Sequence, residues 1–290
     1  MSEENKAKKA DQSNTSGRDF PLWIGLVVII AVIFIYAVLT DPHYQDTLNI
    51  MLFGRSTASA TEGILLSIRI TLTAFAISIL LGLIVGLGRT SNNLIFYNIA
   101  TFYVEVVRGI PLVVLMLYIA FVLLPVVINA LSALGQSTGW AFLQGINIRD
   151  ISFEMRAIVA LAFGYGAYEA EVFRAGIQSI ERGQMEAARS LGMTYFQAMR
   201  FVILPQAIRR VLPPLGNDFI SLLKDSSLAT VLAVPELTQL SRVQRSSTFR
   251  VFEVFNTITV LYLSMTLLLS FLVRRLERKL SSSRRTEQIQ

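Results

Sequence analysis

The sequence has no cysteine, a single histidine and few charged residues, which make up 16% of its 290 residues. Without cysteine there are no disulfides and no thiolate metal sites. The G-x4-G-K-[ST] loop that cradles nucleotide phosphates is also missing. The only histidine, His43, falls in a predicted loop, so serine catalysis would lack its usual base. We therefore expect no catalytic residue, no metal and no cofactor, and we exclude an intramembrane hydrolase.

Apolar residues are abundant instead, at 53% of the chain with a mean hydropathy of +0.55. Soluble domains have about 45–50% apolar and about 25% charged residues. The excess is gathered into runs of about 20 residues, the length that a helix needs to cross a bilayer core of about 30 Å. This pattern excludes a soluble enzyme, a disordered protein and a fibre. The net charge of +6 then reports membrane topology rather than nucleic-acid binding.

Six segments are candidates for membrane spans, which predicts an all-α integral membrane protein. The first is too long for a signal-peptide core of about 7–15 residues, so we interpret it as a retained span. The fourth and fifth carry polar residues that need surroundings lined by protein. The six segments are Phe20–Leu39, Gly63–Gly88, Leu94–Leu124, Arg156–Gly176, residues 208–234 and Val254–Val273.

Lysine and arginine set the predicted orientation, because they are enriched in cytoplasmic segments. The N-terminal tail 1–19, the loop 177–206 and the tail 277–290 hold most of the basic residues. Both termini are therefore predicted to be cytoplasmic. Three arginines on the predicted outer side fit this rule least well. They either dock an acidic surface of a partner protein or belong to a solvated loop; they are Arg242, Arg245 and Arg250.

The loop 177–206 predicts two short amphipathic helices. Helix-forming residues run from Ile180 to Leu191, Gly192 interrupts them, and a second run extends from Tyr195 to Phe201. Glycine permits the left-handed turn that joins such helices. The apolar face predicts packing on a partner protein, on the membrane surface or on the chain's own spans.

The same loop resembles the EAA loop of permeases of binding-protein-dependent ABC transporters, EAA-x3-G-x9-I-x-L-P, with Val202 in place of the usual isoleucine. In that family the loop is the coupling helix that fits a cleft on the ATPase subunit. The resemblance implies that role for the matching positions, which are Glu186, Ala187, Ala188, Gly192, Leu204 and Pro205.

Three further stretches narrow the resemblance to polar amino-acid permeases. They are Glu105–Leu112, Ala167–Ile180 and Leu223–Leu228, similar to that subgroup's E-x2-R-G-x-P-L, A-Y-x-A-E-x-x-R-x-G-I-x-S-I and L-K-x-[ST]-S-L. The resemblance covers about residues 60–276 and implies a type I importer core of five spans. Residues 20–40 are then an extra N-terminal helix. The segment from Pro125 to Phe153 is longer than expected between core spans.

The resemblance implies a transport subunit of the inner membrane that is not an enzyme. Its expected partners are an ABC ATPase dimer, a second identical or related permease chain, an extracytoplasmic binding protein, an amino acid and the lipid bilayer. A permease for another small solute and a stand-alone secondary amino-acid transporter are the alternatives. The secondary transporter is disfavoured because no internal repeat is visible and because it does not explain the EAA loop.

Charged residues inside spans are costly and therefore pair with each other or line a cavity. Glu105 and Arg108 are three residues apart, as are Glu171 and Arg174, so each pair either neutralises itself or places one glutamate on a translocation path. Glu169 has no basic residue three or four positions after it. We predict that it faces a cavity.

Arg69 lies in the second span near Ser67 and Thr71. A guanidinium binds a carboxylate through two hydrogen bonds, so these three residues are candidates for the carboxylate of an amino acid, with a glutamate for its ammonium. The alternative is that Arg69 extends towards the interface while the two hydroxyls bond to the backbone.

The fifth predicted span contains Pro213, Pro214 and Gly216, which we expect to break the helix. An unwound backbone in a membrane is tolerated where it lines a cavity or packs in protein. These residues therefore predict either a gate beside the path or a packing kink. Asp218, Lys224 and Asp225 lie in or next to this predicted break.

Overall fold

The computed structural model describes residues 22–53 and 60–287. The chain divides into two compact units, residues 1–50 and 51–290. The first unit contains α2 (Leu22–Thr40) and most of α3 (Pro42–Phe53), which meet at an angle of 95°. α2 carries no charge, and its predicted helix is confirmed from Leu22 onward. The predicted tail 1–19 lies outside the described residues.

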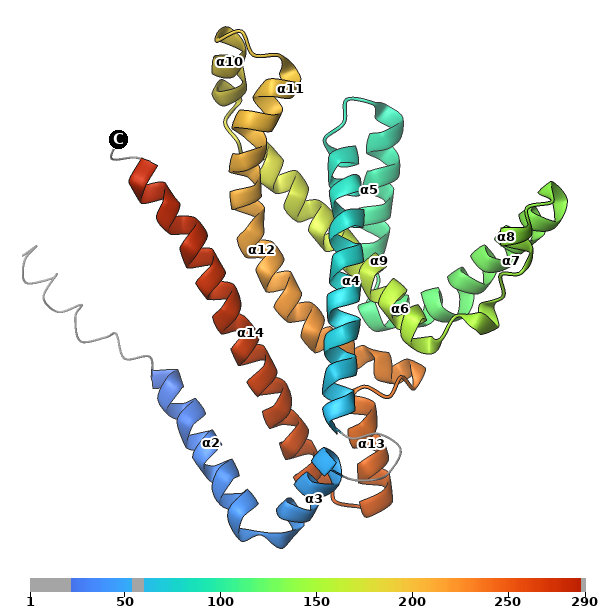
Figure 1. Ribbon diagram of the computed structural model, residues 1–290, viewed down its shortest axis with the longest axis vertical. Helices are drawn as coiled ribbons and strands as arrows, with labels where there is room; N and C mark the ends of the chain where they lie inside the picture. Colours follow the sequence, from blue (N-terminus) through green and yellow to red (C-terminus); the bar gives the residue numbers. More distant parts are fainter. Residues whose placement is uncertain (1–21, 54–59, 288–290) are drawn as a thin grey trace, which may run out of the picture. The chain divides into compact units, whose positions relative to one another are not determined.

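The second unit is all-helical over its described residues, as predicted. Figure 1 shows α10 and α11 at one end of this unit and α13 at the other, with α14 running between these ends. Its elements are α4 (Ala60–Arg89), α5 (Leu94–Gly109), α6 (Leu112–Tyr118), η1 (Ile119–Leu123), α7 (Leu124–Thr138), α8 (Ala141–Gln144), η2 (Ile148–Asp150), α9 (Phe153–Gln178), α10 (Arg182–Ser190), α11 (Tyr195–Ala198), η3 (Met199–Ile203), α12 (Leu204–Asp225), η4 (Ser226–Leu232), α13 (Leu237–Thr248) and α14 (Val251–Glu287).

Three described stretches are helical, long and apolar enough to cross a membrane, namely Thr61–Arg89, Leu112–Thr138 and Val251–Glu277. The bent pair in the first unit adds a fourth if it is counted as one span. α9 and α12 are long helices but carry several charges. Length and apolarity alone therefore do not give the six predicted spans.

The predicted span Leu94–Leu124 is divided into two helices. α5 ends at Gly109, and Ile110 is extended, with φ −106° and ψ 132°. Pro111 causes this break, because its ring disfavours helical geometry in the preceding residue. The helix then resumes and continues to Thr138. Much of the segment after Pro125, which we expected to be an insert between spans, thus extends a helix.

Two π-helical segments occur in the second unit, and each ends two residues before a proline. η1 ends at Leu123 before Pro125, and η3 ends at Ile203 before Pro205. Proline has no N–H, so the carbonyl four residues earlier loses its helical partner. A locally widened helix with i→i+5 bonding is a common response to such a defect.

Pro213 and Pro214 do not break their helix, contrary to our expectation. α12 is continuous from Leu204 to Asp225 and includes both prolines. The chain instead changes geometry at η4 and at Ala233, which is left-handed with φ 56°. Two adjacent prolines remove two neighbouring hydrogen bonds, and the other bonds of a 22-residue helix maintain its course.

The core of the second unit forms around α9, whose most extensive helix contact is with α4. One face of α9 is built from small buried residues, so the two backbones approach closely, as is typical of membrane helices. The added Cβ of an alanine at Gly82 would lie 2.7 Å from the Cβ of Glu169, and at Gly86 it would lie 2.9 Å from the carbonyl oxygen of Ala170. This packing fixes α4 against α9 and positions their charged side chains.

Candidate functional site

The loop between α9 and α12 forms the two predicted short helices. α10 ends in a Schellman motif, in which the N–H of Met193 bonds to the carbonyl of Ala188 at 3.2 Å and that of Gly192 bonds to Arg189 at 3.0 Å. Gly192 has φ +84°, the left-handed geometry for which glycine was predicted. Thr194 then caps α11 through a reciprocal capping box with Gln197.

The apolar residues of this loop divide between two directions. Ala188 is buried, and Met185 and Met199 pack on a small cluster around Ile180 and Ile203. The side chains that connect α10 and α11 instead face outward. Leu191 is 81% exposed, Tyr195 54% and Phe196 82%. The prediction of one apolar face is therefore wrong in part, because the Gly192 turn rotates the second helix away from the first.

The positions that match the EAA pattern lie mostly at the surface of this loop, because the loop is short and packs on one side only. Glu186, Ala187, Gly192, Leu204 and Pro205 are exposed, whereas Ala188 is 4% exposed. Exposed apolar groups of this kind are typical of a surface that meets another protein or a membrane.

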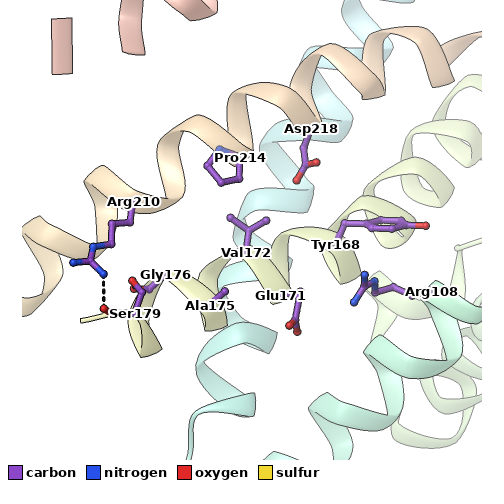
Figure 2. Close-up of a pocket in the computed structure, with 10 residues that line it drawn as sticks. All are labelled: Arg108, Tyr168, Glu171, Val172, Ala175, Gly176, Ser179, Arg210, Pro214 and Asp218. Atoms are coloured by element: carbon purple, nitrogen blue, oxygen red, sulfur yellow. Dashed lines mark hydrogen bonds between the residues drawn. The ribbon is translucent and has the colours of Figure 1, made fainter. Parts of the chain in front are cut away.

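A cavity of about 470 Å³ lies between α5, α9 and α12. Figure 2 shows Arg108 entering from α5 and Asp218 from α12, with residues of α9 along one wall. The guanidinium of Arg108 lies 5.4 Å from the ring centre of Tyr168, within the range of a cation–π contact. The cavity is lined by Arg108, Tyr168, Glu171, Val172, Ala175, Gly176, Ser179, Arg210, Pro214 and Asp218.

The cavity presents groups of both charges. The Oδ2 atom of Asp218 is buried and has no hydrogen-bond partner, so it remains available to a donor. Arg210 donates to the carbonyl of Ser179, the dashed contact of Figure 2. A small molecule that carries both an ammonium and a carboxylate would find an acceptor at Asp218 and a donor at Arg108.

The charged residues beside the cavity form a network that differs from the predicted pairs. Glu171 and Arg174 pair as predicted. Arg89, at the end of α4, also contacts Glu171 at 2.7 Å and reaches Glu105 at 3.6 Å. Glu105 is thus paired with Arg89 rather than with Arg108, because α4 and α5 are antiparallel neighbours that bring the end of α4 beside α5.

The three residues predicted to hold a carboxylate do not converge. Ser67 and Thr71 are buried, and their hydroxyls donate to the carbonyls of Gly63 at 3.0 Å and of Ser67 at 2.7 Å. Arg69 points away from that face and bonds to both carboxylate oxygens of Glu154, at 2.8 and 2.6 Å. The reason is helical geometry, since a residue two positions from another lies on a different side.

Glu169 is fully buried but does not line the cavity. The hydroxyl of Ser78 donates to its Oε1 at 2.8 Å, and its Oε2 has no partner. It lies where α4 and α9 are closest, next to Gly82. The adjacent glycine lets α4 cover this carboxylate, and a cavity role for Glu169 stays a prediction.

Of the three predicted gate residues, Pro214 lines the cavity. Gly216 instead packs on α14, where an added Cβ would lie 2.5 Å from a methyl carbon of Val273. Pro213 is partly buried within the continuous helix. A gate at these residues stays a prediction.

Comparison with known proteins now identifies the family. Residues 78–282 match the family described as the binding-protein-dependent transport system inner membrane component. The chain belongs to this family. It is accordingly an inner-membrane transport component, and its fold is that of the family's permeases.

Several relatives of this permease family match most of the chain. GlnP, the glutamine transport system permease protein of Escherichia coli (strain K12), is 36% identical over 219 residues, which is 76% of this chain and 91% of the relative. The probable glutamine ABC transporter permease protein GlnM of Bacillus subtilis (strain 168) is 36% identical over 236 residues, 81% of this chain and 100% of the relative.

Solved structures confirm the fold of this permease. A crystal structure of an amino acid ABC transporter with histidines is 38% identical with a TM-score of 0.63, and the match covers 76% of this chain and 93% of that one. The MetNI methionine ABC transporter in an inward-facing form is 22% identical with a TM-score of 0.58, over 76% of this chain and 95% of that one. Because its identity is only 22%, the similarity to MetNI shows a shared fold and nothing more.

Sequence reasoning on this permease placed one of six predicted path residues, Glu171, at the cavity. It did not assign a path role to Arg108, Tyr168, Arg210 or Asp218. A signal was present for Asp218, which is an acid inside a predicted span without a basic residue three or four positions away. No such signal was present for Arg210, because a basic residue at this position is expected at the cytoplasmic side of the membrane.

Proposed function

We propose that this chain is the permease subunit of an ATP-binding-cassette importer of polar amino acids. An extracytoplasmic binding protein delivers the amino acid, and a separate ATPase subunit supplies the energy. The relatives named for glutamine transport and the solved amino acid transporter support this substrate class. The observation that carries the proposal is the loop around Gly192, which presents exposed apolar side chains at one end of the unit.

The proposed topology has six spans with both termini in the cytoplasm. α2, α4, the bent α5–α7, α9, α12 and α14 each cross once, which places α10 and α11 in the cytoplasm and α13 outside. The charged network of Arg89 and Glu171 then lies towards the cytoplasmic side. The proposed domains are the tail 1–19, the extra helix 20–40, the permease core 60–276 with the loop 177–206, and the tail 277–290.

In the proposed assembly two permease chains, identical or related, enclose the path, and two ATPase subunits bind the two loops. Glu186, Ala187, Ala188, Gly192, Leu204 and Pro205 form the proposed coupling loop. Leu191 and Phe196 supply apolar contact area of the kind that dominates protein interfaces. Closure of the ATPases moves the loops, and the spans follow because Met185 and Met199 pack on the cluster around Ile180 and Ile203.

The cavity between α5, α9 and α12 is the proposed amino-acid contact in each chain. Its buried acceptor on Asp218 suits an ammonium, and the guanidinium of Arg108 suits a carboxylate. A site built on hydrogen bonds discriminates strongly against analogues that lack the matching group. Glu171 is held by two arginines and supports the shape of the cavity more than it offers a free acceptor.

Uptake into proteoliposomes tests the function. The complex of permease and ATPase subunits is reconstituted with binding protein outside and ATP inside, and radiolabelled glutamine and arginine are supplied with unlabelled sugars as competitors. ATP-dependent uptake that only polar amino acids inhibit is expected. Uptake without ATP, or inhibition by a sugar, would contradict the proposal.

Two variants test the proposed roles of Gly192 and Asp218. Gly192→Val is expected to lower uptake at least tenfold while the permease still folds, because its φ of +84° is strained for any side chain. Asp218→Asn is expected to lower uptake and leave unstimulated ATP hydrolysis unchanged. Gly183→Val, with no atom near its added Cβ, and Asp150→Asn, in an exposed turn, are the matched controls.

A further inference from the structure

A second hollow lies at the other end of the unit, beside α13. Its volume is about 910 Å³, and Figure 1 shows α13, which supplies most of its lining, at the end opposite α10 and α11. The proposed topology places it outside the membrane. Nine residues of η4, α13 and the turn between them line it: Thr230, Val231, Ala233, Gln239, Arg242, Val243, Arg245, Ser246 and Ser247.

The lining of this α13 hollow carries positive charge and hydrogen-bond donors. Two of its residues are arginines, and none of the nine is acidic. Arg242 is exposed and donates to the hydroxyl of Thr230 at the long distance of 3.4 Å. The guanidinium of Arg245 lies 5.9 Å from the ring centre of Phe255 on α14, and its buried Nε has no hydrogen-bond partner among the described residues. The exposed guanidinium of Arg242 is therefore the charge of the hollow that an anionic group from outside the chain can reach.

The basic residues of the α13 hollow also contradict the usual distribution of charge. Lysine and arginine are depleted from short outer segments of membrane proteins, and yet Arg242 and Arg245 lie on one short helix there. Retention of two arginines on this side fits a surface that receives an acidic partner.

A hydrogen-bond chain runs from the α13 hollow into the protein. Arg242 contacts Thr230, whose hydroxyl donates to the side chain of Gln239 at 2.8 Å. The backbone N–H of Gln239 donates to the carboxylate of Glu236 at 2.8 Å. The hydroxyl of Tyr262, on α14, donates to the same carboxylate at 3.0 Å. The chain therefore joins the outer surface to a transmembrane helix.

Glu236 is the centre of this chain and is completely buried. Its carboxylate caps α13 by accepting from the backbone of Thr238 and Gln239. The next residue, Leu237, packs against Gly63 of α4, where an added Cβ would lie 3.1 Å from the Leu237 backbone. A displacement of the start of α13 would therefore change its contacts with both α4 and α14.

The size of the α13 hollow decides between two anionic partners. A lipid phosphate is a single compact group, whereas about 910 Å³ accommodates several side chains at once. Ser246, Ser247 and Gln239 add neutral donors and acceptors along the wall, as expected for contact with a polypeptide. The observations thus favour a protein loop over a lipid headgroup.

We propose that the α13 hollow docks a carboxylate-bearing loop of the delivering binding protein, and that the chain from Arg242 to Tyr262 conveys this docking to α4 and α14. The inference rests on the proposed function and names the contact that the binding protein makes. Charge complementarity at such a contact accelerates association and selects the partner.

The test uses the complete complex of permease and ATPase subunits in nanodiscs of neutral lipid. Its probe is the purified, amino-acid-loaded binding protein that stimulates ATP hydrolysis by the wild-type complex. If no such protein stimulates the wild type, the proposed function itself fails. If one does, the variants below decide the present inference separately.

Arg242→Gln is expected to weaken docking about tenfold and to reduce its dependence on salt. Arg242→Lys should recover part of that loss. Arg149→Gln removes the same charge from another exposed outer turn and should change the docking Kd less than twofold. Equal effects of Arg242→Gln and Arg149→Gln would overturn the proposal. So would an Arg242→Gln variant that docks the probe normally in neutral lipid and binds less anionic lipid than wild type in separate nanodiscs that contain it.

The variant Tyr262→Phe tests the proposed conveying of the docking event to α14 separately from docking itself. It removes the hydroxyl that contacts Glu236 and leaves the hollow intact. The docking Kd should stay within twofold of wild type, while the stimulation of ATP hydrolysis by the loaded binding protein falls at least threefold. Unstimulated hydrolysis should be unchanged. Full stimulation in Tyr262→Phe would refute the conveying role.

Discussion

Gly86→Ala is a direct test of the close packing that positions the charged residues of α4 and α9. The added Cβ would lie 2.9 Å from the carbonyl oxygen of Ala170 and 2.9 Å from the Cβ of Phe173. Neither atom is the end of a flexible side chain, so rotamer changes give no relief. The two helices must separate by a few tenths of an ångström.

The magnitude follows from two opposing terms. Alanine gains about 1 kcal/mol over glycine in a helix interior. Overpacking against fixed atoms costs about 1–3 kcal/mol, and a backbone contact favours the upper half of that range. The net loss of stability is therefore about 1–2 kcal/mol. Since 1 kcal/mol corresponds to about 2–4 °C for 150–250 residues, we expect Tm to fall by roughly 4 °C.

Two control variants make the reasoning refutable. At Gly164 the nearest atom to an added Cβ is the Cδ1 tip of Leu112, at 2.5 Å, which can rotate away. At Gly109 an added Cβ meets nothing within 4 Å. Both alanine variants should stay within about 2 °C of wild type or rise slightly. Thermal unfolding in detergent at one scan rate is the assay, and a Gly86→Ala variant as stable as Gly109→Ala would refute the argument.

Three more outcomes are expected. Burial raises the pKa of Glu236 above its ordinary 4.5. Between the pKa of the unfolded chain and that of the folded state, the folded state holds a proton that the unfolded chain has lost, so stability should fall as the pH rises through this range. The dependence of Tm on pH should therefore be flatter in Glu236→Gln. Ser78→Ala leaves the buried carboxylate of Glu169 without the hydroxyl that donates to it and should cost about 1–3 kcal/mol in thermal unfolding, unlike a surface serine variant. The Arg69–Glu154 pair has side chains 64% and 27% exposed, so a double-mutant cycle should yield at most about 1 kcal/mol; a value several times larger would contradict its exposed character.

The sequence predicted the local structure of the loop 177–206 well, because that structure depends on neighbouring residues. A helix stop at Gly192 requires only that glycine adopts φ +84° at low cost. The two flanking helices follow from local helix formers and from the capping box at Thr194. The Glu171–Arg174 contact is equally local, since residues three apart meet on one helix face.

Prolines were harder to interpret from sequence, because their effect depends on the rest of the helix. Pro111 ends a helix, while Pro213 and Pro214 lie inside one. Pro125 and Pro205 are each accommodated by a π-helical segment. Proline thus has three different outcomes in this chain, and the rest of each helix decides between them.

Sequence alone determined that this chain is a helical membrane permease with an EAA-like loop, because hydropathy and motif spacing are properties of the linear chain. Only the tertiary structure decided which charges share a cavity. Arg108, Glu171 and Asp218 come from three helices, and Glu105 bonds to Arg89 rather than to its helical neighbour. Electrostatic partners across helices depend on the rotation and closeness of each pair, which small residues such as Gly82 and Gly86 set through contacts distant in sequence.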